Sequence, residues 1–223
     1  MMYCVLVAAG SGSRMNHDLP KQFLPVLGKP LLYYTLQSFF SFDEQITVIL
    51  VSKSIYKVEL DEVKQYFPSK NIIFCEGGAT RFLSVKNGLH FVPDNELVFI
   101  HDAARPFADI QLLTRCKEAA IQHGHAIPAT TIKDSIRQLT GTTNLAIDRN
   151  QLRAIQTPQT FQSTFIKKLV SNALRDDYTD EATILEDQGY DVLLVEGSDT
   201  NFKVTLPIDL KVMEVMLQEI NRA

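Results

Sequence analysis

Short apolar runs alternate with amphipathic segments through the first half of the chain, and this alternation restricts the fold more than any other feature. Short runs rich in β-branched residues are typical of buried strands. Strands are predicted at residues 3–8, 45–51, 71–75 and 96–100, and helices at residues 30–40, 58–67, 80–89 and 112–122. Strands and helices at this spacing form βαβ units. The sequence therefore predicts an α/β fold, a Rossmann-like, mostly parallel sheet flanked by helices.

The second half of the chain departs from this pattern in one segment. After a strand expected at residues 126–129, the polar segments 134–139 and 145–147 flank the turn sequence TGTTN. They predict a protruding β-hairpin arm at about residues 130–150, which has little apolar surface of its own to bury. Such an arm is expected to pack on something else, a second subunit being one candidate. A helix, a strand and a helix are expected at residues 162–173, 191–195 and 207–221.

Composition limits the class of protein. No Pro/Gly/Ser-rich linker divides the 223 residues, so one domain is expected over residues 1–223. The net charge of −4 argues against a nucleic-acid binder, and an anionic ligand would need locally clustered cations. Three widely spaced cysteines, Cys4, Cys75 and Cys116, fit no metal-ligand pattern and are expected to be buried free thiols. With no leader-like segment and no apolar run long enough for a membrane span, a soluble cytoplasmic protein is expected.

A loop of small residues, GSGSR at residues 10–14, directly follows the first predicted strand. Small residues let backbone N–H groups approach phosphate oxygens closely. A dinucleotide-binding loop needs a third glycine where Met15 stands and an acid near the end of the second strand, and neither is present. The P-loop pattern is also absent. The loop carries its own arginine, Arg14, and Lys21 follows seven residues later, which indicates a phosphate site of another kind.

His101 and Asp102 end the fourth predicted strand. Neighbouring side chains on a strand point to opposite faces, so a direct acid–base dyad is not expected, and His101 is interpreted as a packed or backbone-bonded histidine. Ligands bind at the carboxyl ends of parallel strands, where Asp102 could hold Mg²⁺ or a substrate hydroxyl. The alternative is that Asp102 caps the following helix. Arg105 is expected in the same site or paired with Asp102.

The string AAGSGSRM, spaced from PKQF, resembles the sugar-nucleotide pyrophosphorylase and nucleotidyltransferase superfamily. More narrowly, the chain is similar to the 2-C-methyl-D-erythritol 4-phosphate cytidylyltransferase family. The motifs that extend the similarity are EGGATRFLSVKNGL, IHDAARPF, KDSIR, DRNQLRAIQTPQTF, TDEATILEDQGY and VEGSDTNFKVTLPIDL. The resemblance implies transfer of CMP from CTP to 2-C-methyl-D-erythritol 4-phosphate, with release of pyrophosphate, in the non-mevalonate isoprenoid pathway. Mg²⁺ is the implied cofactor.

Such a reaction needs cations more than it needs a base. A phosphate monoester is already mostly dianionic at pH 7, so catalysis rests on charge neutralisation and in-line positioning. The resemblance assigns Arg14 and Lys21 to transition-state stabilisation on the triphosphate. It assigns Arg149 and Lys203 to the sugar phosphate. The alternative for each of these four cations, taken alone, is a solvated surface charge, although Lys203 stands between the apolar Phe202 and Val204.

The resemblance also implies the remaining site residues. Those expected to bind CTP are Ala8, Ala9, Gly10, Gly12, Gly77, Gly78, Ala79 and Ser84. Those expected to bind the acceptor are Asp102, Arg105, Ser135 and Thr157. Two positions depart from the family pattern: Ala79 stands where aspartate is usual, and Ser135 where threonine is usual but with the hydroxyl retained.

The resemblance further implies a homodimer with shared active sites. The arm would cross to a second subunit, where Ser135 and Arg149 serve the neighbour's substrate phosphate. Arg14, Lys21 and Lys203 would serve the nucleotide of their own chain, which gives Lys203 a second role beside the one on the sugar phosphate. Two alternatives stay open: a cytidylyltransferase for ribitol 5-phosphate or another polyol phosphate, and a nucleotide-sensing protein that has lost catalysis. An oxidoreductase is disfavoured by the missing glycine and acid.

Overall fold

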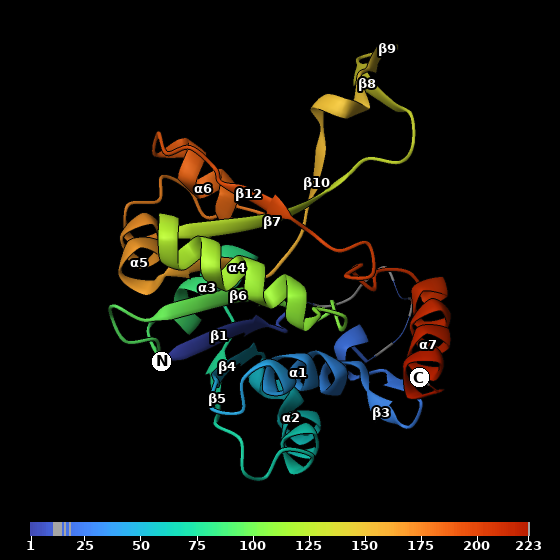
Figure 1. Ribbon diagram of the computed structural model, residues 1–223. Coiled ribbons are helices and arrows are strands. Elements are labelled where there is room, and N and C mark those ends of the chain that lie inside the picture. The colour runs from blue at the N-terminus through green and yellow to red at the C-terminus, as the bar shows by residue number, and fades with distance from the viewer. Residues whose placement is uncertain (11–14, 16, 18, 223) are drawn as a thin grey trace.

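The computed structural model describes residues 1–10, 15, 17 and 19–222, and Figure 1 shows its ribbon. The strands are β1 Met2–Val7, β2 Pro25–Val26, β3 Lys29–Pro30, β4 Thr47–Ser52, β5 Ile72–Glu76, β6 Leu97–Asp102, β7 His125–Thr131, β8 Ile136–Thr140, β9 Thr143–Ile147, β10 Arg153–Ile155, β11 Gln159–Gln162 and β12 Leu194–Glu196. The helices are α1 Leu31–Phe42, α2 Lys57–Gln65, α3 Arg81–Leu89, α4 Ile110–His123, α5 Ser163–Ser171, α6 Glu181–Asp187 and α7 Pro207–Arg222.

The central sheet confirms the predicted mostly parallel α/β architecture. Its strand order is β10-β7-β11-β6-β1-β4-β5, with β12 paired to β7. The strands β5, β4, β1 and β6 run parallel to one another. β11 is antiparallel to both β6 and β7, and β10 is antiparallel to β7. The carboxyl ends of the four parallel strands therefore meet at one edge of the sheet.

Two apolar layers cover the sheet, one on each face. Alternate residues of β1 divide between them, with Cys4 and Leu6 on one face and Tyr3 and Val5 on the other. Side chains of α1, α2 and α4 complete the first layer, and those of α3, α5 and α6 complete the second. Figure 1 shows these helices on either side of the sheet, with α7 lying apart beside β3. This sandwich fixes the strand ends that carry the site.

Five of these elements were not predicted, among them the two-residue strands β2 and β3. β10 and β11 lie in the segment RAIQTPQTF, where a proline and polar residues hide the strand pattern, and α6 lies in an acidic stretch. The last strand is also displaced, since β12 spans Leu194–Glu196 rather than residues 191–195. β11 is buried between β6 and β7, so its strand state depends on pairing with distant residues and not on a local pattern.

The predicted arm is a two-stranded hairpin. β8 and β9 pair antiparallel, from Ile136 opposite Ile147 to Thr140 opposite Thr143, and the loop between them has Gly141 at φ 59°. Glycine suits the first position of such a two-residue loop because it tolerates positive φ. Leu139 and Leu145 on the arm are 78% and 65% exposed. Figure 1 shows the arm rising away from the sheet. These two leucines therefore lack cover from their own chain.

The three cysteines are free and buried, as predicted. No helix within the described residues combines the length and apolar character that crossing a bilayer requires.

Candidate active site

A cavity of about 480 Å³ opens at the carboxyl edge of the sheet. Residues that follow β1, β4, β5 and β6 contribute to its wall, the position at which open α/β sheets bind ligands. Four cations line it, Lys21, Lys53, Arg81 and Lys203, with Asp102 as the lining carboxylate among the described residues. The local charge of the described lining is thus 4 − 1 = +3 in a chain of net charge −4. The expected local cluster of cations is present.

The start of the glycine loop is fastened to the segment that carries Lys21. Gln22 is buried, and its side-chain Nε2 donates to the carbonyl of Ala8 at 2.6 Å and to that of Gly10 at 3.2 Å. These bonds bring Lys21, Ala8, Ala9 and Gly10 to the same cavity wall. Gly12 and Arg14 lie outside the described residues.

The Gly77-Gly78-Ala79 segment packs against residues 8–10 beside the cavity. A Cβ on Gly77 would lie 2.5 Å from Cβ of Ala9, so only glycine permits this approach of the two loops. Gly78, Ala79 and Ser84 line the cavity. Ser84 is buried, and its hydroxyl donates to the Thr80 carbonyl at 2.9 Å and accepts from Gly78 N–H at 3.0 Å. In this structure Ser84 therefore shapes the loop through its hydroxyl.

Asp102 lies at the centre of a buried charge cluster at the end of β6. Its Oδ1 accepts from Arg81 Nε at 3.3 Å and its Oδ2 from Lys203 Nζ at 2.7 Å. Arg105 Nε lies 3.9 Å from Oδ2, which confirms the expected pairing of Arg105 with Asp102. The alternative of a helix cap is wrong, because the following helix, α4, is capped by Asp109, whose side chain accepts from Leu112 N–H at 2.7 Å.

The charges in this cluster set the protonation of its members. Burial alone would raise the pKa of Asp102, but the charges of Arg81 and Lys203 outweigh it and hold that pKa well below its usual range. Burial would lower the pKa of Arg81, but Glu181 and Asp102 raise it further than burial lowers it. Asp102 is thus a carboxylate and Arg81 a cation at any physiological pH.

His101 is packed and hydrogen-bonded, as interpreted from the sequence. Its Nε2 lies 2.9 Å from the carbonyl of Arg105 and its Nδ1 lies 3.0 Å from the Thr157 hydroxyl. A carbonyl can only accept, so Nε2 carries the proton and the Thr157 hydroxyl donates to Nδ1. The same hydroxyl accepts from Asp102 N–H at 3.1 Å. Burial lowers the pKa of His101 to about 4, so the ring is neutral near pH 7.

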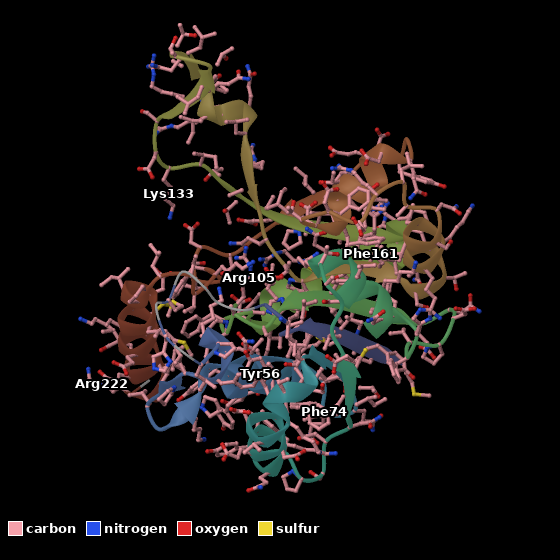
Figure 2. All side chains as sticks on the ribbon, turned by 180° about the vertical axis from the view of Figure 1, so that it is seen from behind. Tyr56, Phe74, Arg105, Lys133, Phe161 and Arg222 are labelled. Atoms are coloured by element: carbon pink, nitrogen blue, oxygen red, sulfur yellow. The ribbon has the colours of Figure 1, made fainter. Side chains whose placement is uncertain are left out.

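The predicted residues fall into two groups in space. Thr157 and Arg105 lie behind the cavity wall, where Thr157 supports Asp102 and Arg105 donates to the carbonyl of Asn201 at 2.8 Å. Ser135 and Arg149 are exposed on the arm and do not line this cavity of their own chain. In Figure 2, Arg105 lies within the body of the molecule and Lys133 where the arm leaves it. The Arg149 guanidinium donates to the Lys133 carbonyl.

Sequence reasoning did not single out five residues that build the site: Gln22, Lys53, Arg81, Glu181 and Thr205. Arg81 and Glu181 do stand inside the motifs EGGATRFLSVKNGL and TDEATILEDQGY. Their place inside these motifs was the available signal. Lys53 stands near the end of the second predicted strand, where a dinucleotide-binding fold would need an acid.

The residues present offer Mg²⁺ limited protein ligation. No cluster of three His, Cys, Asp or Glu side chains that could hold a metal exists within the described residues. Mg²⁺ usually takes one or two carboxylates together with substrate phosphates and water. Asp102 at the cavity wall therefore fits a metal carried by a nucleotide, and does not fit a metal held by the protein alone.

A parallel sheet with a cation-lined cavity beside a glycine loop at its carboxyl edge is the arrangement of a nucleotidyltransferase. The family described as IspD, 2-C-methyl-D-erythritol 4-phosphate cytidylyltransferase, matches residues 2–219. The chain belongs to this family. A curated relative of that name from Phocaeicola vulgatus is 39% identical over 218 residues, covering 96% of this chain and 99% of the relative.

Solved structures agree with this assignment. A 4-diphosphocytidyl-2C-methyl-D-erythritol synthase from Anaerococcus prevotii has a TM-score of 0.84 at 27% identity, covering 98% of this chain and 96% of that one. The 2-C-methyl-D-erythritol 4-phosphate cytidylyltransferase from Thermus thermophilus has a TM-score of 0.74 at 32% identity, covering 96% of this chain and 98% of that one. The expected fold and family are both confirmed.

Proposed function

We propose that the chain transfers the cytidylyl group of CTP to the phosphate of 2-C-methyl-D-erythritol 4-phosphate and releases pyrophosphate. The observation that carries this proposal is the cavity at the carboxyl edge of the sheet, which four cations and one carboxylate of the described residues line in a net acidic chain. Two phosphorylated substrates must bind next to each other in this cavity, and cations are needed to offset the repulsion between their negative charges.

The reaction needs no protein base. A phosphate oxygen of the acceptor attacks the α-phosphorus of CTP, and the bond from that phosphorus to the bridging oxygen breaks. The electron pair leaves with pyrophosphate. The acceptor phosphate is mostly dianionic at pH 7. The neutral, doubly hydrogen-bonded His101 is consistent with a mechanism that needs no proton acceptor there.

The four assigned cations divide between the two substrates. Lys21, brought to the glycine loop by Gln22, supports the triphosphate together with Arg14. Lys203 is the cation offered to the acceptor phosphate, with Arg149 of a neighbouring arm. Negative charge that builds on the triphosphate as pyrophosphate leaves is best stabilised by fixed cations already in place.

Recognition of the base rests on backbone groups in this proposal. Gly78 and Ala79 line the cavity without polar side chains, which lets a small pyrimidine approach main-chain donors and acceptors. Ser84 holds this segment in shape. Ala79 has no carboxylate, so selection of cytosine falls on the backbone of this segment.

Mg²⁺ would enter with CTP, with Asp102 as the carboxylate able to share in holding it. When bound, the metal neutralises phosphate charge. A reducing compartment such as the cytoplasm fits the three free, buried cysteines. The acidic net charge gives no support for a nucleic-acid partner.

The arm supports a two-fold homodimer with shared sites. Ser135 and Arg149 are exposed on an arm whose strands pair only with each other in the described chain, and Leu139 and Leu145 lack cover. A partner whose cavity receives this arm would bury those leucines and gain a cation.

Complementation between two inactive variants tests the shared sites. Homodimers of Arg149→Ala and of Lys21→Ala should each be nearly inactive, whereas exchanged heterodimers keep one intact site and regain up to half of wild-type activity. No recovery after verified exchange would mean that each chain builds its own site.

A pyrophosphate-release assay that crosses CTP and UTP with 2-C-methyl-D-erythritol 4-phosphate and ribitol 5-phosphate tests the proposed function. Turnover is expected with CTP and the erythritol phosphate, and the other three combinations should be slower by at least about one order of magnitude. Preference for ribitol 5-phosphate would replace the acceptor in the proposal. Binding of CTP without turnover on any acceptor would instead favour a nucleotide sensor.

A further inference from the structure

Arg81 joins two carboxylates from distant parts of the chain. It is the first residue of α3, directly after the glycine segment proposed to bind the base. Its Nη1 and Nη2 donate to Glu181 Oε1 and Oε2 at 2.6 and 3.1 Å, while its Nε donates to Asp102 Oδ1 at 3.3 Å. A planar guanidinium held on two sides by carboxylates has a fixed position, which an ammonium could not reproduce.

Glu181 is itself rigidly held. Its side chain is 1% exposed, and it is the first residue of α6. Gln159 on β11 accepts through Oε1 from the N–H groups of Glu181 and Ala182 at 2.8 and 3.1 Å. Since β11 pairs with β6, the strand that ends in Asp102, the two carboxylates that hold Arg81 belong to one connected framework.

Arg81 and Lys203, which both bond Asp102, differ in exposure and in their number of carboxylate partners. Arg81 is 20% exposed and uses Nε, Nη1 and Nη2 on carboxylates, so its charge is already matched. Lys203 is 38% exposed, and its Nζ donates to Asp102 Oδ2. An incoming acceptor phosphate would therefore draw Lys203 away from Asp102 and leave Arg81 in place. After that exchange, Asp102 Oδ2 would keep only its longer contact with Arg105 Nε, at 3.9 Å, and Arg81 would still fix the carboxylate through Oδ1.

We propose that Glu181 and Arg81 are positioning residues that hold Asp102 ready for the acceptor while Lys203 moves to its phosphate. Neither residue needs to touch substrate in this role. Glu181 orients Arg81, and Arg81 orients Asp102. The inference rests on the proposed function and adds to it residues that act only through Asp102.

The test compares Glu181→Gln with Asp187→Asn, a matched control. Asp187 lies on the same helix and pairs with Arg175 at 3.1 Å, away from the residues that line the cavity. Both variants lose one carboxylate charge and one arginine ion pair. We expect Glu181→Gln to lower kcat/KM for 2-C-methyl-D-erythritol 4-phosphate by about 10- to 100-fold, with KM for CTP within about twofold of wild type. Asp187→Asn should match wild type in both.

A double-variant cycle separates positioning from general loss of structure. In an Asp102→Asn background, measured at high enzyme concentration, Glu181→Gln should change kcat/KM by less than about twofold, because the group it positions is gone. Equal effects of Glu181→Gln in both backgrounds would overturn the inference. If Glu181→Gln does not fold, Arg81→Lys carries the same test, because it keeps a positive charge beside Glu181 but lacks the Nε–H group that reaches Asp102.

The outcomes for the two proposals are distinguishable. An inactive wild-type chain on CTP and the erythritol phosphate overturns the proposed function and, with it, the positioning role. An active wild type whose Glu181→Gln and Arg81→Lys variants keep normal acceptor kinetics overturns the positioning role alone. A loss of acceptor kinetics that disappears in the Asp102→Asn background supports it.

Discussion

The neutral state of His101 predicts that the folded protein loses stability in mild acid. The ring is fully buried. Its Nε2–H group donates a hydrogen bond to the Arg105 carbonyl, and its Nδ1 accepts one from the Thr157 hydroxyl. Protonation would place a proton where Nδ1 must accept, and would bring a charge into the interior. Burial therefore lowers the pKa of His101 from an ordinary value near 6.5 to about 4.

The sign and size follow from proton linkage. Between pH 6.5 and pH 4 the unfolded chain binds a proton at His101 and the folded chain does not, so the free energy of unfolding falls as pH falls. The stabilisation is fully present above pH 6.5. A shift of roughly 2.5 pKa units corresponds to about 3 kcal/mol over the full range, and to about 2 kcal/mol between about pH 7 and about pH 5. The pKa of His125 is also lowered by burial, so the wild-type slope contains a second contribution of the same sign.

Urea denaturation followed by circular dichroism at about pH 7 and about pH 5 measures this difference. His101→Gln can still donate to the Arg105 carbonyl and accept from Thr157, but it does not titrate. The variant should lose about 2 kcal/mol less than wild type between the two pH values. His90→Gln, a change at an exposed histidine, should keep the wild-type difference. Equal pH dependence in wild type and His101→Gln would refute the reasoning.

Three further outcomes follow from the site. Lys21→Ala should lower kcat on the order of 10²- to 10³-fold and change CTP binding far less, and normal turnover with an intact circular dichroism spectrum would remove Lys21 from the mechanism. Gly77→Ala forces a Cβ to within 2.5 Å of the Ala9 Cβ and should reduce stability by about 1–3 kcal/mol in thermal unfolding while weakening CTP binding; an unchanged Tm and Kd would contradict that. EDTA should abolish turnover and Mg²⁺ restore it, and if Asp102→Asn keeps the wild-type Mg²⁺ dependence, Asp102 does not hold the metal.

Elements with a local pattern were predictable from the sequence. The buried strands of the parallel sheet and the helices that cover it repeat their apolar residues at the expected spacing, and the hairpin has turn residues between two polar strands. The prediction that the chain is a single domain stays a prediction. β11 could not be predicted in this way, because its four residues become a strand only between β6 and β7.

The sequence predicted which residues belong to the candidate site better than it predicted which groups their side chains contact. Motif resemblance named Ser84 and Thr157 as ligand-binding, yet each hydroxyl is engaged within the protein, at Thr80 and Gly78 or at His101 and Asp102. A hydroxyl in a motif can act by shaping the backbone as well as by touching a ligand, and the sequence does not distinguish the two.

Long-range ion pairs were beyond sequence reasoning for a different reason. Arg81 and Glu181 are 100 residues apart, and Asp102 and Lys203 are 101 apart, so neither pair has a spacing that a helix or a strand would reveal. A buried ion pair brings little net stability when compared with apolar residues of the same volume. Its presence in the wall of a cavity, joined to the carboxylate at the end of β6, is better explained by what it orients. In this site the arginine is used where two carboxylates must be held at once, and the lysine where a partner must be exchanged. That division of side-chain chemistry makes the cavity both fixed in shape and able to accept a phosphate.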